Sequence, residues 1–362
     1  MVDLYRLVWP VLAAIDAERA HGLALRALKS GIAAALLSDK FEHSSLATKV
    51  WDLNFGSPIG LAAGFDKNAE ALAGLFDLGF GFVEIGGVTP LPQPGNPKPR
   101  LFRLAEDWAV INRFGFNSDG IDAVRSRMAA WRAAGHRNLV GVNLGKNKAA
   151  SDAAADYAAG VAAFAPLADF LVINVSSPNT PGLRALQSTE PLIEIIKAAR
   201  DACASSGANV PLLLKIAPDL TSDDVAAACR AGLEQGIDGF VVSNTTTARP
   251  EALKSPHKTE AGGLSGAPLF EPSTRLLREV YALTEGRVPL IGVGGVASGA
   301  DAYAKIRAGA SLVQIYSALV FQGPALVGRI KRDLVALLTR DGFTSVGQAV
   351  GADHDSPGGK IQ

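Results

Sequence analysis

The residues of this 362-residue chain that could do chemistry are amides, hydroxyls and lysines, and they directly follow short apolar runs. In chain order, the polar residues at these places are Asp66, Lys67, Thr89, Asn143, Lys146, Asn174, Ser176, Ser177, Asn179, Lys215, Ser243, Asn244, Thr245, Thr246, Tyr316 and Ser317. Asp66 is the main carboxylate among them, so the set offers mostly hydrogen-bond donors and positive charge. If these residues meet at one place, they favour an anionic ligand with several hydrogen-bonding atoms.

Three segments late in the chain are typical of a phosphate site. They are Gly262–Gly266, Gly292–Gly295 and the turn Tyr316-Ser317. Backbone N–H groups exposed by glycine, together with a helix that starts near Ser298, would cradle a dianion. A phosphate there, with amides and a lysine nearby, fits flavin mononucleotide (FMN). Lys215 could then place a positive charge beside the N1–C2=O edge of the flavin ring and stabilise its reduced, anionic form.

A repeated plan of apolar run, loop and helix-like stretch must position these groups. Strands are predicted near 58–63, 82–87, 139–144, 170–175, 211–216, 239–243, 289–294 and 311–316. Helices are predicted between them, for instance at 68–78, 150–165, 190–204, 221–235, 273–284 and 298–309. The strand runs are rich in β-branched residues and nearly all apolar, as in parallel strands that are buried on both faces. About eight alternations of strand and helix predict a (β/α)8 barrel, or TIM barrel, whose site lies at the strand C-termini. A doubly wound open sheet is the runner-up, but the single glycine fingerprint it would want after strand one is missing.

Two parts of the chain fall outside this repeat, which spans 46–340. Residues 1–45 show helical spacing of apolar residues in two runs, with Pro10 either kinking the first helix or sitting in its first turn. They predict either a helical hairpin packed on the barrel or an amphipathic element in the membrane interface, and the residues alone leave both open. The segment 341–362 is predicted to be a disordered tail.

The bulk composition excludes several classes of protein. Lys+Arg and Asp+Glu both number 35, a balance that argues against a nucleic-acid binder. The two cysteines, Cys203 and Cys229, suggest a reducing compartment and are expected to be free structural thiols. The five histidines lack metal-ligand spacing, so no metal site is expected. No segment approaches the length of a membrane-spanning helix, and the N-terminus lacks the order of charges of a signal peptide, which predicts a cytosolic-facing protein.

Several motifs together resemble dihydroorotate dehydrogenases. They are the segments Gly64–Asn68, Thr89–Arg103, Asn112–Asn117, Gly141–Asn147, Asn174–Arg184, Lys215–Asp219 and Asn244–Thr247. The resemblance runs in order from about residue 5 to 340. It is closest to the quinone-dependent class, because an N-terminal helical extension is present and Ser177 stands where the soluble class carries cysteine. This resemblance implies a flavoprotein that oxidises dihydroorotate to orotate in pyrimidine biosynthesis and passes the electrons to a membrane quinone.

The resemblance also implies which residues hold the cofactor FMN. They are Ala63, Gly64, Phe65, Asp66, Lys67, Gly87, Asn143, Asn174, Lys215, Ser243, Gly266, Gly295, Tyr316 and Ser317. Gly87 departs from the pattern, since many relatives are expected to carry threonine there. A contact between flavin and the backbone survives that change, whereas a contact to a hydroxyl does not.

Substrate and base are implied in the same way. The substrate would be held by Lys67, Asn112, Arg113, Phe114, Gly115, Phe116, Asn174, Asn179, Asn244 and Thr245. Lys67 would supply the counter-charge for the substrate carboxylate. Ser177 would take the proton from C5, with a relay through Thr180 and a water near Phe116, because an isolated serine is a poor base. Without the motif, the sequence would favour a structural role for Ser177, as an N-cap or turn serine before Pro178.

A lipid-soluble quinone needs an apolar path, and residues 1–45 could form one. His21, Arg103 and Tyr316 are the polar groups expected at its inner end, although a purely structural role for His21 stays open. The resemblance therefore implies peripheral contact with the cell membrane on its cytoplasmic side.

Three rival functions fit part of the pattern. A related barrel flavoprotein could reduce fumarate or NAD or act on another pyrimidine, but Ser177 and the absence of iron–sulfur cysteine clusters disfavour it. A membrane-docking or partner-binding protein on a degenerate barrel conflicts with the intact polar set. A sugar-phosphate isomerase would need a glutamate or histidine base at a strand end, and its nearest candidate, Glu84, lies inside a strand and is expected to lack a partner.

Overall fold

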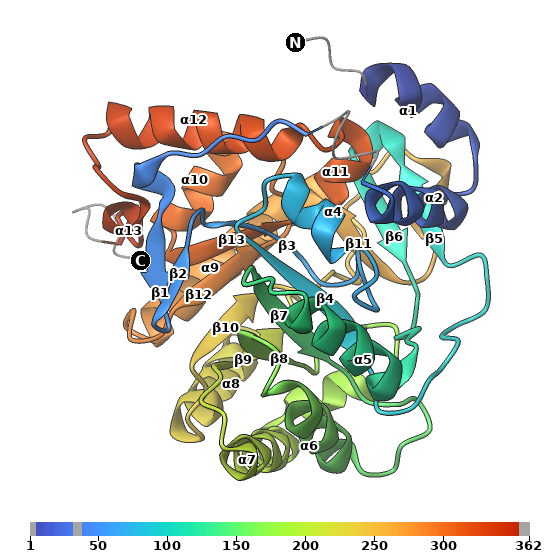
Figure 1. Ribbon diagram of the computed structural model, residues 1–362, viewed down its shortest axis with the longest axis vertical. Coiled ribbons are helices and arrows are strands. Elements are labelled where there is room, and N and C mark those ends of the chain that lie inside the picture. The colour runs from blue at the N-terminus through green and yellow to red at the C-terminus, as the bar shows by residue number, and fades with distance from the viewer. Residues whose placement is uncertain (1–4, 32–37, 355–362) are drawn as a thin grey trace.

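Parallel strands close into a barrel in a computed structural model that describes residues 5–31 and 38–354 (Figure 1). Within these residues the barrel has eight strands, in the ring order β3, β4, β7, β8, β9, β10, β12, β13. Their bounds are β3 Ile59–Leu61, β4 Phe82–Val88, β7 Leu139–Leu144, β8 Phe170–Asn174, β9 Leu212–Ile216, β10 Gly239–Val242, β12 Leu290–Val293 and β13 Ala310–Ile315. The predicted (β/α)8 barrel is confirmed, and each barrel strand overlaps one predicted strand.

Helices cover the outside of the barrel (Figure 1). They are α4 Leu72–Asp77, α5 Gly120–Ala133, α6 Ala153–Phe164, α7 Thr189–Ser206, α8 Ser222–Glu234, α9 Phe270–Leu283, α10 Gly299–Arg307, α11 Ser317–Gln322, α12 Leu326–Arg340 and α13 Val346–Ala349. Two of them begin at the expected caps, because the Thr221 hydroxyl accepts the Asp224 N–H at 3.2 Å and the Ser298 hydroxyl accepts the Asp301 N–H at 3.1 Å. The thiols Cys203 and Cys229 are free and lie on the buried faces of α7 and α8, as expected.

A hairpin of β1 Thr48–Val50 and β2 Leu53–Phe55 closes the N-terminal end of the barrel. Phe55 meets Phe82 with ring centroids 5.4 Å apart, and the Trp51 indole N–H donates to the Asp238 carbonyl at 2.8 Å, just before β10. Phe82 and Phe170 begin strands β4 and β8, so aromatic rings fill the barrel interior at its N-terminal end. The open end is therefore the opposite one, where the strands finish.

A second sheet and two helices lie beside that open end. The sheet has the order β11 Gly263–Gly266, β6 Ala109–Asn112, β5 Leu101–Leu104 and is antiparallel, and the repeat of the sequence did not predict it. Helices α1 Tyr5–Ala14 and α2 Ala17–Lys29 lie next to it (Figure 1), and Pro10 is inside α1. The apolar positions expected at 32–36 fall outside the described residues. Among the helices that are described, none is long and apolar enough to cross a membrane.

The expectation of a disordered tail at 341–362 is wrong for its first part. Residues 341–354 carry α13, whose Val346 and Ala349 are buried, and the Gly351 and Asp353 N–H groups bond back to α10. Arg307 fixes this segment further through an ion pair with Asp353 at 2.7 Å. Its glycines and polar residues predicted a loose segment, but burial of the short apolar face of α13 holds it on the barrel. Residues 355–362 lie outside the description.

Candidate active site

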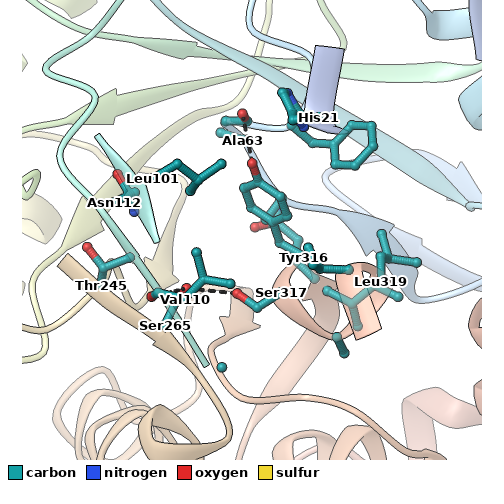
Figure 2. Close-up of a pocket in the computed structure, with 18 of the residues that line it drawn as sticks. His21, Ala63, Leu101, Val110, Asn112, Thr245, Ser265, Tyr316, Ser317 and Leu319 are labelled. Atoms are coloured by element: carbon teal, nitrogen blue, oxygen red, sulfur yellow. Dashed lines mark hydrogen bonds between the residues drawn. The ribbon is translucent and has the colours of Figure 1, made fainter. Parts of the chain in front are cut away.

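One cavity of about 450 Å³ lies at the C-terminal ends of the barrel strands and continues under α1 and α2. Most residues expected in the site line it: Ala63, Gly64, Phe65, Lys67, Gly87, Asn143, Asn174, Ser177, Lys215, Ser243, Gly266, Gly295, Tyr316 and Ser317, then Asn112, Phe114, Gly115, Phe116, Asn179, Asn244 and Thr245, and finally His21 and Arg103. Figure 2 shows part of this lining, with the Tyr316 side chain between His21 and Ser317. Residues spread over nearly the whole chain are thus brought to one place by the strand ends.

Asp66 and Arg113 were expected to contact ligand, but they do not line the cavity. Asp66 is fully buried and its carboxylate accepts the backbone N–H groups of Glu70 at 2.9 Å and Ala71 at 2.8 Å, which holds the loop before α4. Burial raises the pKa of this carboxyl. Arg113 turns outward to an ion pair with Glu260 at 2.7 Å. Both residues therefore shape the loops whose neighbours face the cavity.

The amides of the site form a continuous hydrogen-bonded chain. Glu84 inside the barrel accepts from the Asn143 amide at 2.7 Å and from the Gln314 amide. Asn143 Oδ1 accepts from Asn174 Nδ2 at 2.8 Å, and Asn174 Oδ1 accepts from Asn244 Nδ2 at 3.1 Å. Glu84 therefore does have partners, and they are the amides of the site. The chain fixes the orientation of three side chains that the sequence predicted to bind ligand.

Ser177 fits both of its sequence interpretations. Its Oγ accepts the backbone N–H of Asn179 at 3.3 Å, as in a turn, and the residue also lines the cavity while only 9% exposed. Thr180 is three residues further along the same loop, and within the described residues its buried hydroxyl oxygen makes no hydrogen bond. A buried hydroxyl without a partner is rare and points to a functional contact, so the two hydroxyls suit a proton path.

Arg184 connects three loops at the strand ends. Its guanidinium donates to the Ser176 carbonyl at 3.1 Å and the Thr245 carbonyl at 2.9 Å, and it pairs with Asp219 at 2.6 Å. These loops follow β8, β10 and β9, respectively. The rigid fork of the guanidinium fixes the backbone on either side of the cavity, including the residue before Ser177.

Lys67 lies in a mainly positive and partly buried environment. Its ammonium donates to the Gly64 carbonyl at 2.6 Å and sits 4.1 Å from the centre of the Phe114 ring. Burial and the nearby Arg100 guanidinium lower the pKa of Lys67 to about 8, against a smaller opposing effect of Glu18 and Asp66. The ammonium lacks a carboxylate partner within the described residues, which suits it to bind an anionic ligand.

Two arginines at β5 tie the N-terminal helices to the second sheet. Arg100 makes a two-oxygen contact with Glu18 on α2, at 2.8 Å from Nη2 and 3.1 Å from Nε. Arg103 donates to the carbonyls of Leu12, at 2.6 Å, and Ala13, at 3.1 Å, at the C-terminal end of α1. A positive charge at this end also suits the helix dipole. Arg103 therefore holds α1 in place as well as lining the cavity.

His21 and Tyr316 meet around Phe65 in the part of the cavity under α2. The rings of His21 and Phe65 are edge to face with centroids 5.0 Å apart, and those of Phe65 and Tyr316 are 5.7 Å apart. Burial, and secondarily Lys67, lower the pKa of His21 to about 3, so its ring is neutral near pH 7. The Tyr316 hydroxyl donates to the Gly64 carbonyl at 3.2 Å.

The glycine loops form the opposite end of the cavity. Within the described residues, the N–H groups of Gly295 and Ser317 donate no backbone hydrogen bond. A Cβ at Gly295, where φ is +74°, would lie 2.5 Å from the Phe270 backbone, so only glycine fits there. Ser265 and Ser317 join their hydroxyls at 2.8 Å across the loops (Figure 2). Bare amides at the start of α11 make this end suitable for a phosphate.

The sequence is similar to known proteins over almost its whole length. A family model described as dihydroorotate dehydrogenase matches residues 45–338. The chain belongs to the dihydroorotate dehydrogenase family. It is 57% identical over 361 residues to a protein of Rhodospirillum rubrum named dihydroorotate dehydrogenase (quinone), covering 99% of this chain and 97% of that one. A mitochondrial protein of Mus musculus with the same name is 52% identical over 349 residues, covering 94% and 87% of the two chains.

The fold agrees with that of solved members of the family. A crystal structure of DHODH from Eimeria tenella in complex with ferulenol matches with a TM-score of 0.89 at 43% identity, covering 94% of this chain and 96% of that one. The resemblance found in the sequence motifs is thereby confirmed, as is the barrel fold.

Within this family, Gly87 has a local explanation. A Cβ at position 87 would lie 2.6 Å from the ring of Phe116, and a Cβ at Gly145 would lie 3.0 Å from the same ring. The Phe116 ring thus rests on two glycines, and the space of a threonine side chain at position 87 is taken by that ring. The backbone of Gly87 still lines the cavity.

Some lining residues escaped the sequence prediction. Asn117 belongs to a motif used for the family resemblance, and within the described residues its buried Oδ1 makes no hydrogen bond. Ser265 lies inside a glycine segment that was noted only for its glycines. Its partner Ser317 could have indicated it, but the contact joins residues 52 positions apart and depends on the fold.

Proposed function

We propose that this protein is a quinone-dependent dihydroorotate dehydrogenase that contains FMN and acts at the cytoplasmic face of the cell membrane in pyrimidine biosynthesis. The observation that carries the proposal is one continuous cavity, which joins the amides and lysines of the strand ends to the apolar faces of α1 and α2. Such a cavity can admit a charged, hydrogen-bonding substrate and an apolar acceptor to the same cofactor. When bound, FMN accepts the hydride from C6 of dihydroorotate and delivers the electrons to the quinone.

Substrate recognition rests on residues of the polar end. Lys67 pairs with the substrate carboxylate, and the amides of Asn112, Asn179 and Asn244 match the alternating donors and acceptors of the ring. Asn179 Nδ2 donates to Asn112 Oδ1 at 3.1 Å, so these two amides are already oriented. Ser177 takes the proton from C5, and the buried hydroxyl of Thr180, three residues along the same loop, continues the relay through a water.

The pH dependence of orotate binding tests the role of Lys67. Burial and Arg100 hold the pKa of Lys67 near 8, and only the protonated lysine attracts the carboxylate. We expect the Kd for orotate, followed by flavin absorbance, to be constant below this pKa. Above it the Kd should rise about tenfold per pH unit until it reaches the value of neutral lysine. A Kd that stays level to pH 9.5 or higher would contradict this role, and Lys67→Met should bind weakly at every pH.

FMN fits the described residues at both ends. The free amides of Gly295 and Ser317 suit its phosphate, and Lys215, which is 6% exposed and lines the cavity, suits an electron-rich ring edge. Lys215 stands opposite Asn174 in the pairing of β8 with β9, so its position is fixed by the strands.

The apolar end of the cavity supports the choice of acceptor. Val8 and Leu23 line the cavity and are also 43% and 44% exposed, so the mouth opens at an apolar surface. Leu7 and Val11 on α1 extend this surface and are 70% and 66% exposed. Exposed apolar side chains around an opening favour contact with a lipid surface, from which a quinone can enter.

A charged face on α1 should separate quinone reduction from dihydroorotate oxidation. We expect the double variant Leu7→Asp, Val11→Asp to bind lipid vesicles more weakly and to lose kcat/KM for a long-chain quinone by about tenfold or more. Flavin reduction by dihydroorotate should be unchanged. Leu91→Asp is the matched control, because Leu91 is 68% exposed and does not line the cavity. If the double variant binds vesicles as tightly as Leu91→Asp does, membrane contact through α1 is contradicted.

The proposed function is tested by anaerobic mixing of the purified protein with dihydroorotate and then with a ubiquinone analogue. Bleaching of the flavin absorbance followed by rapid recovery with the quinone is expected, with no recovery from fumarate or NAD. Absence of bleaching would overturn the substrate, and recovery only with fumarate or NAD would overturn the acceptor.

A further inference from the structure

A lysine behind the glycine loop has no role in the chemistry described so far. Lys305 on α10 is fully buried, and its ammonium donates to the hydroxyls of Ser273 and Thr274 on α9, both at 2.9 Å. Within the described residues it forms no ion pair: Asp301 and Glu271 are the charged groups that face it, on α10 and α9, and neither reaches salt-bridge distance. Burial without a carboxylate is unfavourable for an ammonium.

The contacts of Lys305 lead directly to the glycine loop. The Ser273 hydroxyl, which accepts from Lys305, lies 3.1 Å from the Gly294 carbonyl and 3.1 Å from the Phe270 carbonyl of its own helix, so the two carbonyls share its proton. The Lys305 stem also packs on the strand below, since a Cβ at Gly292 would lie 3.1 Å from Lys305 Cδ. Gly294 and Gly295 line the cavity on their other side. One serine therefore separates a buried cation from the loop whose amide is free for an anion.

Burial lowers the pKa of Lys305 to about 7, against the weaker attraction of Asp301 and Glu271. The ammonium is thus only marginally stable in the protein without its ligands. An anion on the cavity side of the loop would stabilise it, because charges interact strongly where water is excluded. The favourable interaction is mutual, so the ammonium would strengthen binding of the same anion.

We propose that Lys305 is a positioning residue for the phosphate of the flavin: it holds the Gly294–Gly295 loop through Ser273 and supplies a buried positive charge behind it. This inference rests on the proposed FMN cofactor. It implies that Lys305 contributes to the preference for a flavin with a phosphate over riboflavin, which has the same ring and none.

Lys331 provides a matched comparison. Lys331 lies on α12 and is also buried, at 4% exposure. Its ammonium donates to the backbone carbonyls of Phe41 and Gly79. Burial lowers its pKa as well. It does not line the cavity and has no contact with the glycine loop, so it reports the effect of removing a buried lysine as such.

The test is a competition between two flavins on the holoprotein. Wild type, Lys305→Met and Lys331→Met are dialysed against mixtures of FMN and riboflavin at pH 7, and the bound flavins are released and separated. We expect Lys305→Met to lower the preference for FMN by about tenfold or more, as for one buried charge–charge interaction, and Lys331→Met to leave it unchanged. Equal weakening of both flavins, or the same shift in Lys331→Met, would overturn the proposal.

A second measurement needs no variant. The same competition on wild-type protein should show the preference for FMN falling between about pH 7 and 9, because Lys305 loses its proton while the phosphate, with a second pKa near 6, stays a dianion. A preference independent of pH would overturn the role of Lys305. The flavin extracted from the purified protein is identified first: absence of FMN overturns the proposed cofactor, whereas FMN with an unchanged preference overturns only this inference.

Discussion

Replacement of Ser177 with alanine is expected to slow the reduction of the flavin by dihydroorotate by about 10²- to 10⁴-fold, the usual contribution of a positioned general base. The physical reason is that Ser177 offers the cavity-lining hydroxyl of its loop, with the buried Thr180 hydroxyl three residues away. Stopped-flow absorbance under anaerobic conditions measures this step alone. Reoxidation by quinone and the Kd for orotate should be unchanged, because neither needs a base.

Ser57→Ala is the control for loss of structure. Ser57 is 2% exposed and its Oγ accepts the N–H two residues ahead, from Ile59 at 3.2 Å, as Ser177 does from Asn179. It lies before β3 at the closed end of the barrel. If Ser57→Ala slows flavin reduction as much as Ser177→Ala, the effect comes from the turn and Ser177 is not the base. Thr180→Val probes the relay, since removal of a hydroxyl without a partner should not destabilise the fold yet should slow the same step.

Lys215→Met should slow flavin reduction by about 10²- to 10³-fold, the size seen when one preorganised electrostatic group is removed. Lys215 is the last residue but one of the apolar strand β9 and is 6% exposed, so its charge acts in a site largely closed to water. Loss of that charge disfavours the reduced, anionic flavin, and the midpoint potential should become more negative. A potential titration and stopped-flow absorbance measure the two effects, which should change together.

Lys146→Met separates this effect from the removal of any strand-end lysine. Lys146 follows β7 and is 9% exposed, but its ammonium is turned to the carbonyls of Asn147 at 3.0 Å and Ala150 at 3.1 Å and does not line the cavity. The midpoint potential of the flavin in Lys146→Met should equal that in the wild type. A normal potential in Lys215→Met would show that the lysine acts elsewhere than at the flavin.

The barrel could be predicted because each strand is marked by a short apolar run of neighbouring residues. Runs such as Phe170–Asn174 are buried over their whole length, and the polar residue at the end of each run marks the mouth. Parallel strands place their C-terminal ends at one rim, so the order of the motifs was enough to bring Lys67, Ser177 and Lys215 together. The physics of one repeated unit accounts for most of the candidate site.

The remainder depends on contacts that the sequence does not show. Strand β11 carries two glycines and pairs with β6 about 150 residues earlier, so neither propensity nor spacing predicts it. Asp66 and Arg113 stand within the motifs, but their side chains turn away from the cavity to hold loops. Lys305 lies in the predicted helix 298–309 without any signal of its own, because its burial arises only when α9 packs against α10. Motifs identify the neighbourhood of a site, and packing decides which members face the ligand.

The hydrogen bonds that link Glu84 to the amides of the site all run in one direction, with each amide donating toward Glu84. Because Glu84 accepts at both oxygens, Asn143 must turn its N–H inward, and Asn174 and Asn244 then follow with the same direction. No single amide can be reversed without setting two N–H groups or two oxygens against each other. A neutral glutamine at position 84 could donate as well as accept, and both senses of the chain would then be possible. The carboxyl group inside the barrel thus sets the direction of the hydrogen bonds in the site. It selects one of the two donor–acceptor arrangements that the same residues could form.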